Sequence, residues 1–348
     1  MISTIRGSLW AYPCWSGLHI GYAFGALLFA CWGTQVLTGW FMTFRYSGVV
    51  ADFAAFDSIE MMVREVSWGW LFRIAHANGA SMFFLFLYIH MMRGIALGIS
   101  RGEAWRIGVI IWVLLMGTAF LGYVLPMGQM SFWALTVITS LLTVLPYVGS
   151  DALWFVWGGD WIGEGTLQRV YTLHYLLPLV LGVLMGVHVM AFHEVGSSGQ
   201  EVWSTSAVSM HPYSVVKDIW LIGWLGMFFA VIVCEYPDVF GHPDNYIEMD
   251  RLVTPSHIVP EWYFLPMYGL LRSVPSKPVG VIMMGVSLLG TIRWSEVIWQ
   301  ASFTRLWGSV HLLGWGVCIG WLGGELPIYP YVEGALFVGL MWLMSWIG

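Results

Sequence analysis

The chain of 348 residues is 58% hydrophobic and only 10% charged, with a formal net charge of −6 and a mean hydropathy of +0.74. A soluble globular protein carries about 25% charged residues, so this composition excludes a water-facing exterior on all sides. Apolar stretches of about 20 residues recur, and each is long enough to cross a bilayer core as a helix. The sequence therefore predicts an all-α polytopic membrane protein, and no nucleic-acid partner is expected.

Eight segments are predicted to span the membrane. In chain order they cover residues 20–44, 75–97, 107–125, 171–192, 219–235, 279–294, 307–322 and 332–347. The first is too long for the apolar core of a signal peptide. We expect the first four spans to form a four-helix bundle within residues 1–205, and the others to form a C-terminal part in residues 206–348.

Two connections differ from the spans. Residues 126–170 contain the apolar run SFWALTVITSLLTVLPYVG, which Pro146 interrupts, so helices lying along the membrane are predicted there. Residues 236–278 hold seven prolines. Since helices do not survive that density, this connection is predicted to be irregular and to pack on the bundle.

Histidines at equal spacing mark the second and fourth spans. His76 and His90 begin and end HANGASMFFLFLYIH, and His174 and His188 do the same in HYLLPLVLGVLMGVH. Fourteen residues at about 100° each make nearly four full turns, so both members of a pair lie on one helix face, about 21 Å apart along the axis. Imidazoles inside a span are costly without a partner. One such pair alone would fit hydrogen-bonded structural histidines equally well.

The second and fourth spans run in the same direction, because an even number of crossings separates their starts. His76 therefore faces His174 near one membrane surface, and His90 faces His188 near the surface that bears the termini. Each facing pair can supply both axial ligands of a haem iron inside a helix bundle. The spacing predicts two bis-histidine b-type haems with irons about 20 Å apart.

Glycines repeat the same interval on the other two helices of the predicted bundle. Gly25 and Gly39 lie in the first span, and Gly108 and Gly122 lie in the third, each pair fourteen residues apart. Glycine permits a close approach of the backbone to a ligand, as a porphyrin between helices requires. With 41 glycines in the chain, either pair alone would carry little weight.

Arginines at span ends are candidate partners of the haem propionates. They are Arg73, Arg93 and Arg169, three to five residues from the nearest of the four histidines. Bidentate pairing of a guanidinium with a carboxylate suits this role. Ordinary arginines that extend toward the membrane surface would occupy the same positions.

Four stretches resemble motifs of one family, cytochrome b of the quinol–cytochrome c reductase complex, which is respiratory complex III. They are RIAHANGASMFFLFLYIHMMRG, GYVLPMGQMSFW, HPYSVVKDI and PEWYFLPMYGLLRS. The resemblance covers nearly the whole chain. The fused second half and the fourteen-residue spacing of the second histidine pair favour the respiratory form over the shorter plastid type.

The resemblance implies a function. Quinol would be oxidised beside a low-potential haem on His76 and His174, and an electron would cross to a high-potential haem on His90 and His188 to reduce quinone at the opposite face. The implied substrates are ubiquinol and ubiquinone. The implied partners are the Rieske iron–sulfur protein, a cytochrome c1-type subunit, other complex III subunits, a second copy in a homodimeric complex, and membrane lipid. The implied location is the mitochondrial inner membrane, with a bacterial source left open.

The PEWY stretch, Pro260 to Tyr263, resembles the quinol-oxidation loop of that family. A carboxylate at Glu261, among aromatic residues, can bind a quinol hydroxyl and take its proton. A loop carboxylate facing water would have the same sequence. The resemblance adds Tyr123 and Tyr268 as walls of this site.

Quinone reduction in that family uses a histidine, a serine and an aspartate near the opposite face. The corresponding residues here are His193, Ser197 and Asp218. A histidine and an acid near quinone can deliver its protons, although a helix-capping aspartate and an interfacial histidine would look alike.

The chain departs from the family at Met127, where tryptophan is usual, and at Ala134 and Leu135, where smaller residues such as Gly-Ala are usual. We expect the bulk of Leu135 to narrow the quinol pocket and to weaken inhibitors that pack there.

Two other functions stay open. The first is a di-haem membrane anchor of a different quinone-linked respiratory enzyme, against which the PEWY stretch and the fused second half argue. The second is a haem-free transporter that relays protons through buried histidines. That function needs neither the repeated histidine interval nor the matching glycines.

Overall fold

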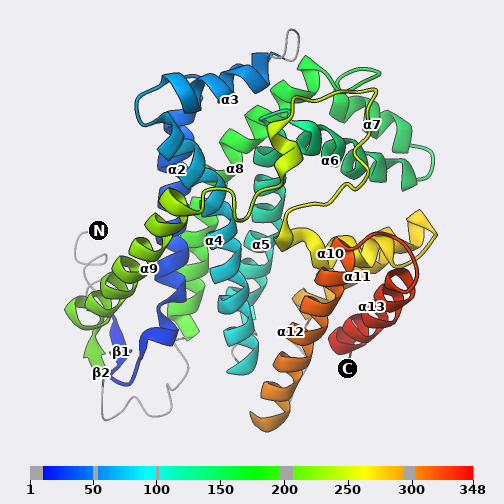
Figure 1. Cartoon of the computed structure of the whole chain (residues 1–348). Coiled ribbons are helices and arrows are strands. Elements are labelled where there is room, and N and C mark those ends of the chain that lie inside the picture. The colour runs from blue at the N-terminus through cyan, green and yellow to red at the C-terminus, as the bar shows by residue number, and fades with distance from the viewer. Residues whose placement is uncertain (1–10, 50–53, 99–101, 196–206, 294–301, 348) are drawn as a thin grey trace.

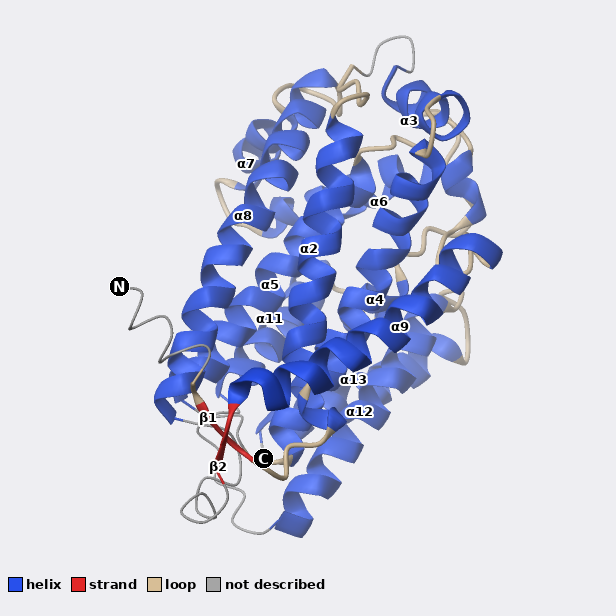
Figure 2. Cartoon of the chain, turned by 90° about the vertical axis from the view of Figure 1, so that its left-hand side faces the viewer, coloured by secondary structure: helices blue, strands red, loops and turns tan. Residues whose placement is uncertain are grey.

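The computed structural model describes residues 11–49, 54–98, 102–195, 207–293 and 302–347. Long helices run roughly side by side, with short helices at one end and a small pair of strands near the other (Figures 1 and 2). In chain order the helices are α2 (Phe24–Thr43), α3 (Ala54–Glu65), α4 (Gly69–Ala96), α5 (Gly102–Val124), α6 (Gln129–Thr139), α7 (Gly149–Trp157), α8 (Glu164–Val195), α9 (Val215–Glu235), α10 (Leu265–Arg272), α11 (Lys277–Arg293), α12 (Ser302–Gly324) and α13 (Tyr331–Ile347).

Helices α2, α4, α5 and α8 form the predicted bundle. α2 packs along α4, and α5 packs along α8, while α9 contacts α2 and α4. In the second half, α12 packs on α10, α13 and α4. α4 is therefore shared between the bundle and the C-terminal part, and the larger buried hydrophobic cluster includes residues of α4, α5, α10 and α12.

Helices occupy all eight predicted spans. Within the described residues, five segments are long and apolar enough to cross a membrane: α2, α4, α5, α8 up to Glu194, and Met210–Glu235, which contains α9. α11 and α13 contain shorter apolar stretches of Lys277–Ile292 and Tyr331–Met344. Length and composition thus support a polytopic helical membrane protein, with five spans rather than eight meeting both criteria.

The fold is mostly helical, as predicted, with one small addition. Strand β1 (Pro13–Trp15) pairs antiparallel with β2 (Ala207–Ser209), with Pro13 opposite Ser209. Three residues are too few for an alternating pattern to be recognised in a sequence. The pair ties the chain before α2 to the chain before α9, which begins after a π-type turn at Met210–Ser214.

Two helices in the connections were not predicted. α3 buries Ala55, Ser58, Ile59 and Met62, an amphipathic spacing that packs its apolar side on α4. α10 forms inside the proline-rich connection, which is otherwise irregular apart from short 3-10 turns at Pro243–Tyr246 and Trp262–Phe264. Pro266 lies in the first turn of α10, where the missing N–H costs no helical hydrogen bond.

The apolar run in residues 126–170 does not form one continuous helix. α6 passes into a 3-10 turn at Ser140–Val144, and α7 starts after Pro146. Both short helices lie at the end of the bundle near α3 (Figure 1).

Candidate functional site

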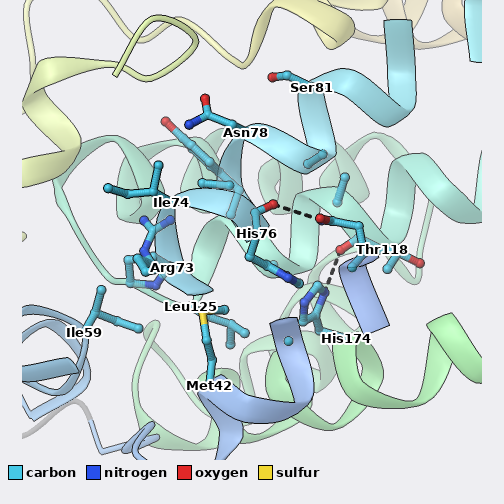
Figure 3. A pocket seen from close by; sticks show the side chains of 18 of the residues that line it. Met42, Ile59, Arg73, Ile74, His76, Asn78, Ser81, Thr118, Leu125 and His174 are labelled. Carbon is cyan, nitrogen blue, oxygen red and sulfur yellow. Dashed lines mark hydrogen bonds between the residues drawn. The ribbon is translucent and has the colours of Figure 1, made fainter. Parts of the chain in front are cut away.

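The four span histidines meet in the two predicted pairs. The ring centroids of His76 and His174 are 6.1 Å apart, and those of His90 and His188 are 6.4 Å apart. Figure 3 shows the first pair, with the two imidazoles converging from α4 and α8. Both pairs join the same two helices, so α4 and α8 run parallel, as the sequence predicts.

The gap within each pair fits a single metal ion. Imidazole nitrogens bind transition metals at about 2 Å, and the ring centre lies roughly 1 Å behind the nitrogen. Two rings that share one metal therefore stand about 6 Å apart, which both observed pairs match.

Hydrogen bonds at Nδ1 set the tautomers of the first pair. Nδ1 of His174 lies 2.8 Å from the backbone oxygen of Thr118, which can only accept, so Nδ1 carries the proton. Nδ1 of His76 lies 2.9 Å from Oγ1 of Thr38, whose hydroxyl already donates to the carbonyl of Thr34 at 2.7 Å. Nδ1 of His76 must then be the donor as well. Both rings keep an unprotonated Nε2, the form that binds a metal.

The four predicted glycines lie against the four histidine rings. A Cβ atom on Gly39 would stand 2.9 Å from Cε1 of His76, and one on Gly122 would overlap Cε1 of His174. At the second pair, a Cβ on Gly108 would stand 3.2 Å from Cε1 of His188, and one on Gly25 would stand 3.9 Å from that of His90. A side chain at Gly39 or Gly122 would therefore displace the facing ring, one at Gly108 would crowd it, and a Cβ at Gly25 would make ordinary contact.

We expect Gly122→Ala to displace the His174 ring and to weaken cofactor binding at the first pair, because overpacking a tight site costs about 1–3 kcal/mol. The measurement is the visible spectrum of the purified protein, in which a haem held at that pair, as the sequence predicts, would lose intensity. Gly117→Ala is the matched control on the same helix, since a Cβ there meets no atom within 4 Å. Equal spectra for both variants would contradict the assignment.

A cavity of about 820 Å³ opens beside the first pair. Its lining includes His76, His174, Arg73, Tyr123 and Glu261. This volume lies within the roughly 300–1,000 Å³ usual for ligand sites. The first histidine pair and the PEWY loop thus share one cavity.

The three candidate arginines differ in position. Arg73 lines the cavity together with His76, and Figure 3 shows both side chains on α4. Arg93 lies near the second pair, where one of its amino groups donates to the backbone oxygen of Gly21 at 3.1 Å. Arg169 is exposed and donates to the carbonyl of Gly165 in its own helix, outside the cavity lining. The structure therefore does not bring Arg169 to the histidines.

Glu261 places a carboxyl group on the cavity wall. Burial raises its pKa to about 7, although the nearby positive charge of Arg73 opposes this shift. The hydroxyl of Tyr123, also in the lining, has no hydrogen-bond partner among the described residues. Glu261 and a tyrosine with an unsatisfied hydroxyl therefore line the same cavity, an arrangement that suits a ligand with its own hydroxyl groups.

Two expected wall residues lie outside the cavity lining. The hydroxyl of Tyr268 donates to the backbone oxygen of Ile258 at 3.0 Å, and Arg272 covers its ring at 5.0 Å. Pro260 precedes Glu261 but does not line the cavity, whereas Tyr263 does. Leu135, expected to narrow this pocket, instead packs in a separate buried cluster with Val124 and Phe132.

At the other end of the bundle, the N-terminal segment around β1 connects two of the candidate quinone residues. The ring of Tyr12 stacks on His193 with centroids 4.0 Å apart. Two residues later, burial raises the pKa of the Cys14 thiol, and the nearby Asp218 carboxylate adds to this shift. Ser197 lies outside the described residues.

The sequence reasoning missed the polar groups behind the first histidine pair. Thr38 and Thr118 bond the two Nδ1 atoms, and Gln35 donates to the backbone oxygen of His76 at 2.9 Å. A polar residue on an apolar span near a candidate histidine is a usable signal for such partners. For Thr118 no side-chain pattern could help, because its backbone oxygen makes the contact.

Fold and site define a helical membrane protein with two facing histidine pairs in its core and an acid-lined cavity beside one of them. Residues 9–196 match the family model described as Cytochrome b/b6/petB, and residues 248–333 match the one described as Cytochrome b(C-terminal)/b6/petD. The chain belongs to the cytochrome b family, whose members bind b-type haems.

Curated relatives and a solved structure support the same family. Cytochrome b of Chondrus crispus is 41% identical over 343 residues, covering 95% of this chain and 90% of the relative. Cytochrome b of Cyanidium caldarium is 40% identical, with 95% and 89% covered. A chain of a structure titled "Hyperthermophilic respiratory Complex III" superposes with a TM-score of 0.91 at 28% identity, covering 100% of this chain and 94% of that chain.

Proposed function

We propose that this chain is the cytochrome b subunit of a respiratory quinol–cytochrome c reductase. One b-type haem would be held by His76 and His174, and a second by His90 and His188. Quinol would be oxidised in the cavity beside the first pair, and quinone would be reduced near His193 and Asp218. The observation that carries the proposal is the pair of metal-sized gaps between facing imidazoles, at equal heights on two parallel helices.

When bound, the two haems supply one-electron transfer across the bundle. His76 and His174 would offer an unprotonated Nε2 to the iron, because Oγ1 of Thr38 and the backbone oxygen of Thr118 accept from their Nδ1 atoms. Arg73 and Arg93 supply positive charge for propionates at opposite ends of α4.

The protein groups of the cavity deal with the protons of quinol. With a pKa of about 7, Glu261 is poised to accept a proton near neutral pH and to release it again. The free hydroxyl of Tyr123 can donate to the second quinol oxygen. Tyr263 lies in the wall and limits access of water.

The remaining parts of the proposal rest on the resemblance to the cytochrome b family. They are ubiquinone as the substrate, the Rieske protein and a cytochrome c1-type subunit as partners, a homodimeric complex, and the mitochondrial inner membrane as the location. His193 and Asp218 would deliver protons to quinone at the face opposite the cavity, with Ser197 as an added contact.

The test is a reduced-minus-oxidised visible spectrum of the purified complex, combined with an assay of cytochrome c reduction by quinol. We expect two b-type components that titrate at separate potentials, together with quinol-dependent activity. A spectrum with no haem component would contradict the proposal and favour the proton-relay transporter. Two components without cytochrome c reduction would point instead to a membrane anchor of another enzyme.

A further inference from the structure

Helix α4 has a second functional side besides the one that carries His76 and His90. Ser81, Phe84 and Tyr88 follow each other at intervals of three and four residues, so they lie on one face. At about 100° per residue, that face is roughly 130° away from the histidine face. It points toward the loop that carries Glu261.

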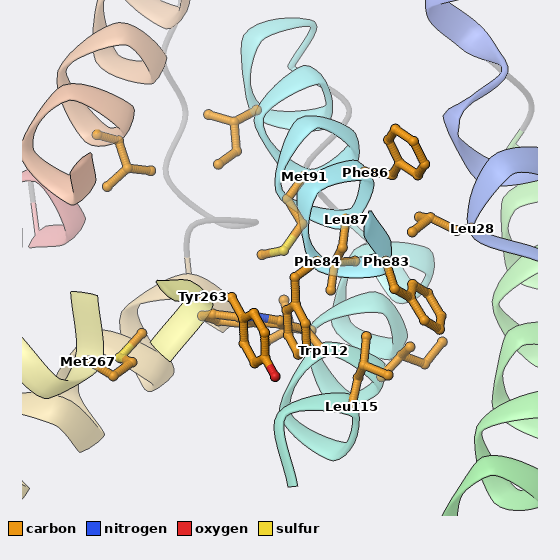
Figure 4. Close-up of a cluster of buried hydrophobic side chains, with 14 of the residues drawn as sticks. Leu28, Phe83, Phe84, Phe86, Leu87, Met91, Trp112, Leu115, Tyr263 and Met267 are labelled. Carbon is orange, nitrogen blue, oxygen red and sulfur yellow. The ribbon is translucent and has the colours of Figure 1, made fainter. Parts of the chain in front are cut away.

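Three contacts join this face to the loop. The indole Nε1 of Trp262 donates to Oγ of Ser81 at 3.1 Å. The ring of Tyr263 stacks on Phe84 with centroids 4.1 Å apart and planes at 4°, as Figure 4 shows. The hydroxyl of Tyr88 donates to the backbone oxygen of Tyr263 at 2.6 Å.

The loop has little internal structure with which to fix Glu261. The next residues, Trp262–Phe264, form a single 3-10 turn, and the side chain of Glu261 makes no capping hydrogen bond to it. The local backbone bond runs from the N–H of Phe264 to the oxygen of Glu261, at 2.8 Å. The turn leads directly into α10 at Leu265, which anchors its far end, so the residues next to Glu261 depend on the contacts from α4.

We propose that Tyr88 is a positioning residue for quinol oxidation, which with Ser81 and Phe84 fixes the turn after Glu261 so that the carboxyl group faces the cavity. This inference rests on the proposed function and deepens it. Tyr88 itself does not line the cavity, so it acts through the loop and not on the quinol. The same helix thereby sets both the histidine pair and the proton acceptor.

The test is Tyr88→Phe in the full complex, which removes the hydroxyl and keeps the ring. We expect kcat for quinol oxidation to fall about tenfold, since small misplacements of a reacting group are costly, while KM changes less than about twofold. We also expect the acid limb of the pH profile to move to lower pH. The charged and titratable groups around Glu261 are Arg73, Tyr123 and Tyr263. In the variant, the displaced carboxyl group of Glu261 would gain contact with water, which lowers its pKa.

Trp105→Phe is the matched control, because it also removes one buried side-chain bond to a backbone oxygen, that of Thr291 at 2.9 Å. This bond joins α5 to α11, and its loss should leave kcat and the pH profile unchanged. Wild-type kinetics in Tyr88→Phe, or an equal loss in both variants with no change in the pH profile, would overturn the inference.

Glu261→Gln distinguishes a failure of the positioning role of Tyr88 from a failure of the proposed function. If it stops quinol oxidation while Tyr88→Phe is normal, the positioning role is wrong and the proposed function stands. If Glu261→Gln is fully active in a complex that retains both haem components, the role assigned to the loop fails.

Discussion

Replacing His90 with alanine should remove one of the two b-type haem components and block quinone reduction at the face that bears the termini. The imidazole of His188 would then face an open gap, with one axial ligand lost. The component assigned to His76 and His174 should remain. The measurement is a potentiometric titration of the purified complex, followed in the visible spectrum.

His257→Ala is the control for this variant, because His257 lies in the connection between α9 and α10 and belongs to neither histidine pair. It should retain both components. If both components also persisted in His90→Ala, the pairing of His90 with His188 would be wrong.

Glu261→Gln should reduce the rate of quinol oxidation by about 10²-fold or more, the usual range for the loss of a general base. Glutamine keeps the shape of the side chain and one acceptor oxygen, but it cannot take a proton at neutral pH. Binding of quinol should change less than turnover.

The direction in which the rate of quinol oxidation changes with pH tests the same prediction. The pKa of Glu261 is raised by burial to about 7, and the ionised form is the base. The wild-type rate should therefore fall as the pH drops through about 7, and this limb should be absent from the variant. Glu248→Gln, in the same connection but outside the cavity lining, should keep both the rate and the limb. A wild-type profile in Glu261→Gln would contradict the assignment of the base.

The long helices and the histidine pairs could be predicted from the sequence, because both depend on local periodicity. Apolar runs fix where a span lies, and the fourteen-residue interval fixes which residues share its face. The glycine pairs follow the same interval, so their contacts with His76, His90, His174 and His188 extend the same reasoning to neighbouring helices.

The arginines show where nearness along the chain misleads. Arg73 and Arg93 stand three residues from a histidine, which turns them only about 60° from its face. Arg169 stands five residues before His174, about 140° around the helix. Arg169 accordingly donates a hydrogen bond to a backbone oxygen of its own helix. Its angle around the helix relative to His174 could have been calculated from the sequence.

Other features depend on contacts between distant segments. Three such contacts join residues 56 to 196 positions apart. They are the backbone oxygen of Thr118 that meets His174, the strand pair β1–β2, and the contact of Tyr88 with the PEWY loop. No local pattern carries that information. α10 is a different case, since its start at Pro266 obeys a rule for helix N-termini that the high density of prolines obscured.

The central claim is that the two facing histidine pairs each hold iron. Diffraction data from crystals of the complex, collected at the iron absorption edge, test it most directly. The account predicts one anomalous peak between the rings of His76 and His174 and another between those of His90 and His188, about 20 Å apart along the bundle. Iron found elsewhere in this chain, or no iron between either pair of rings, would contradict it.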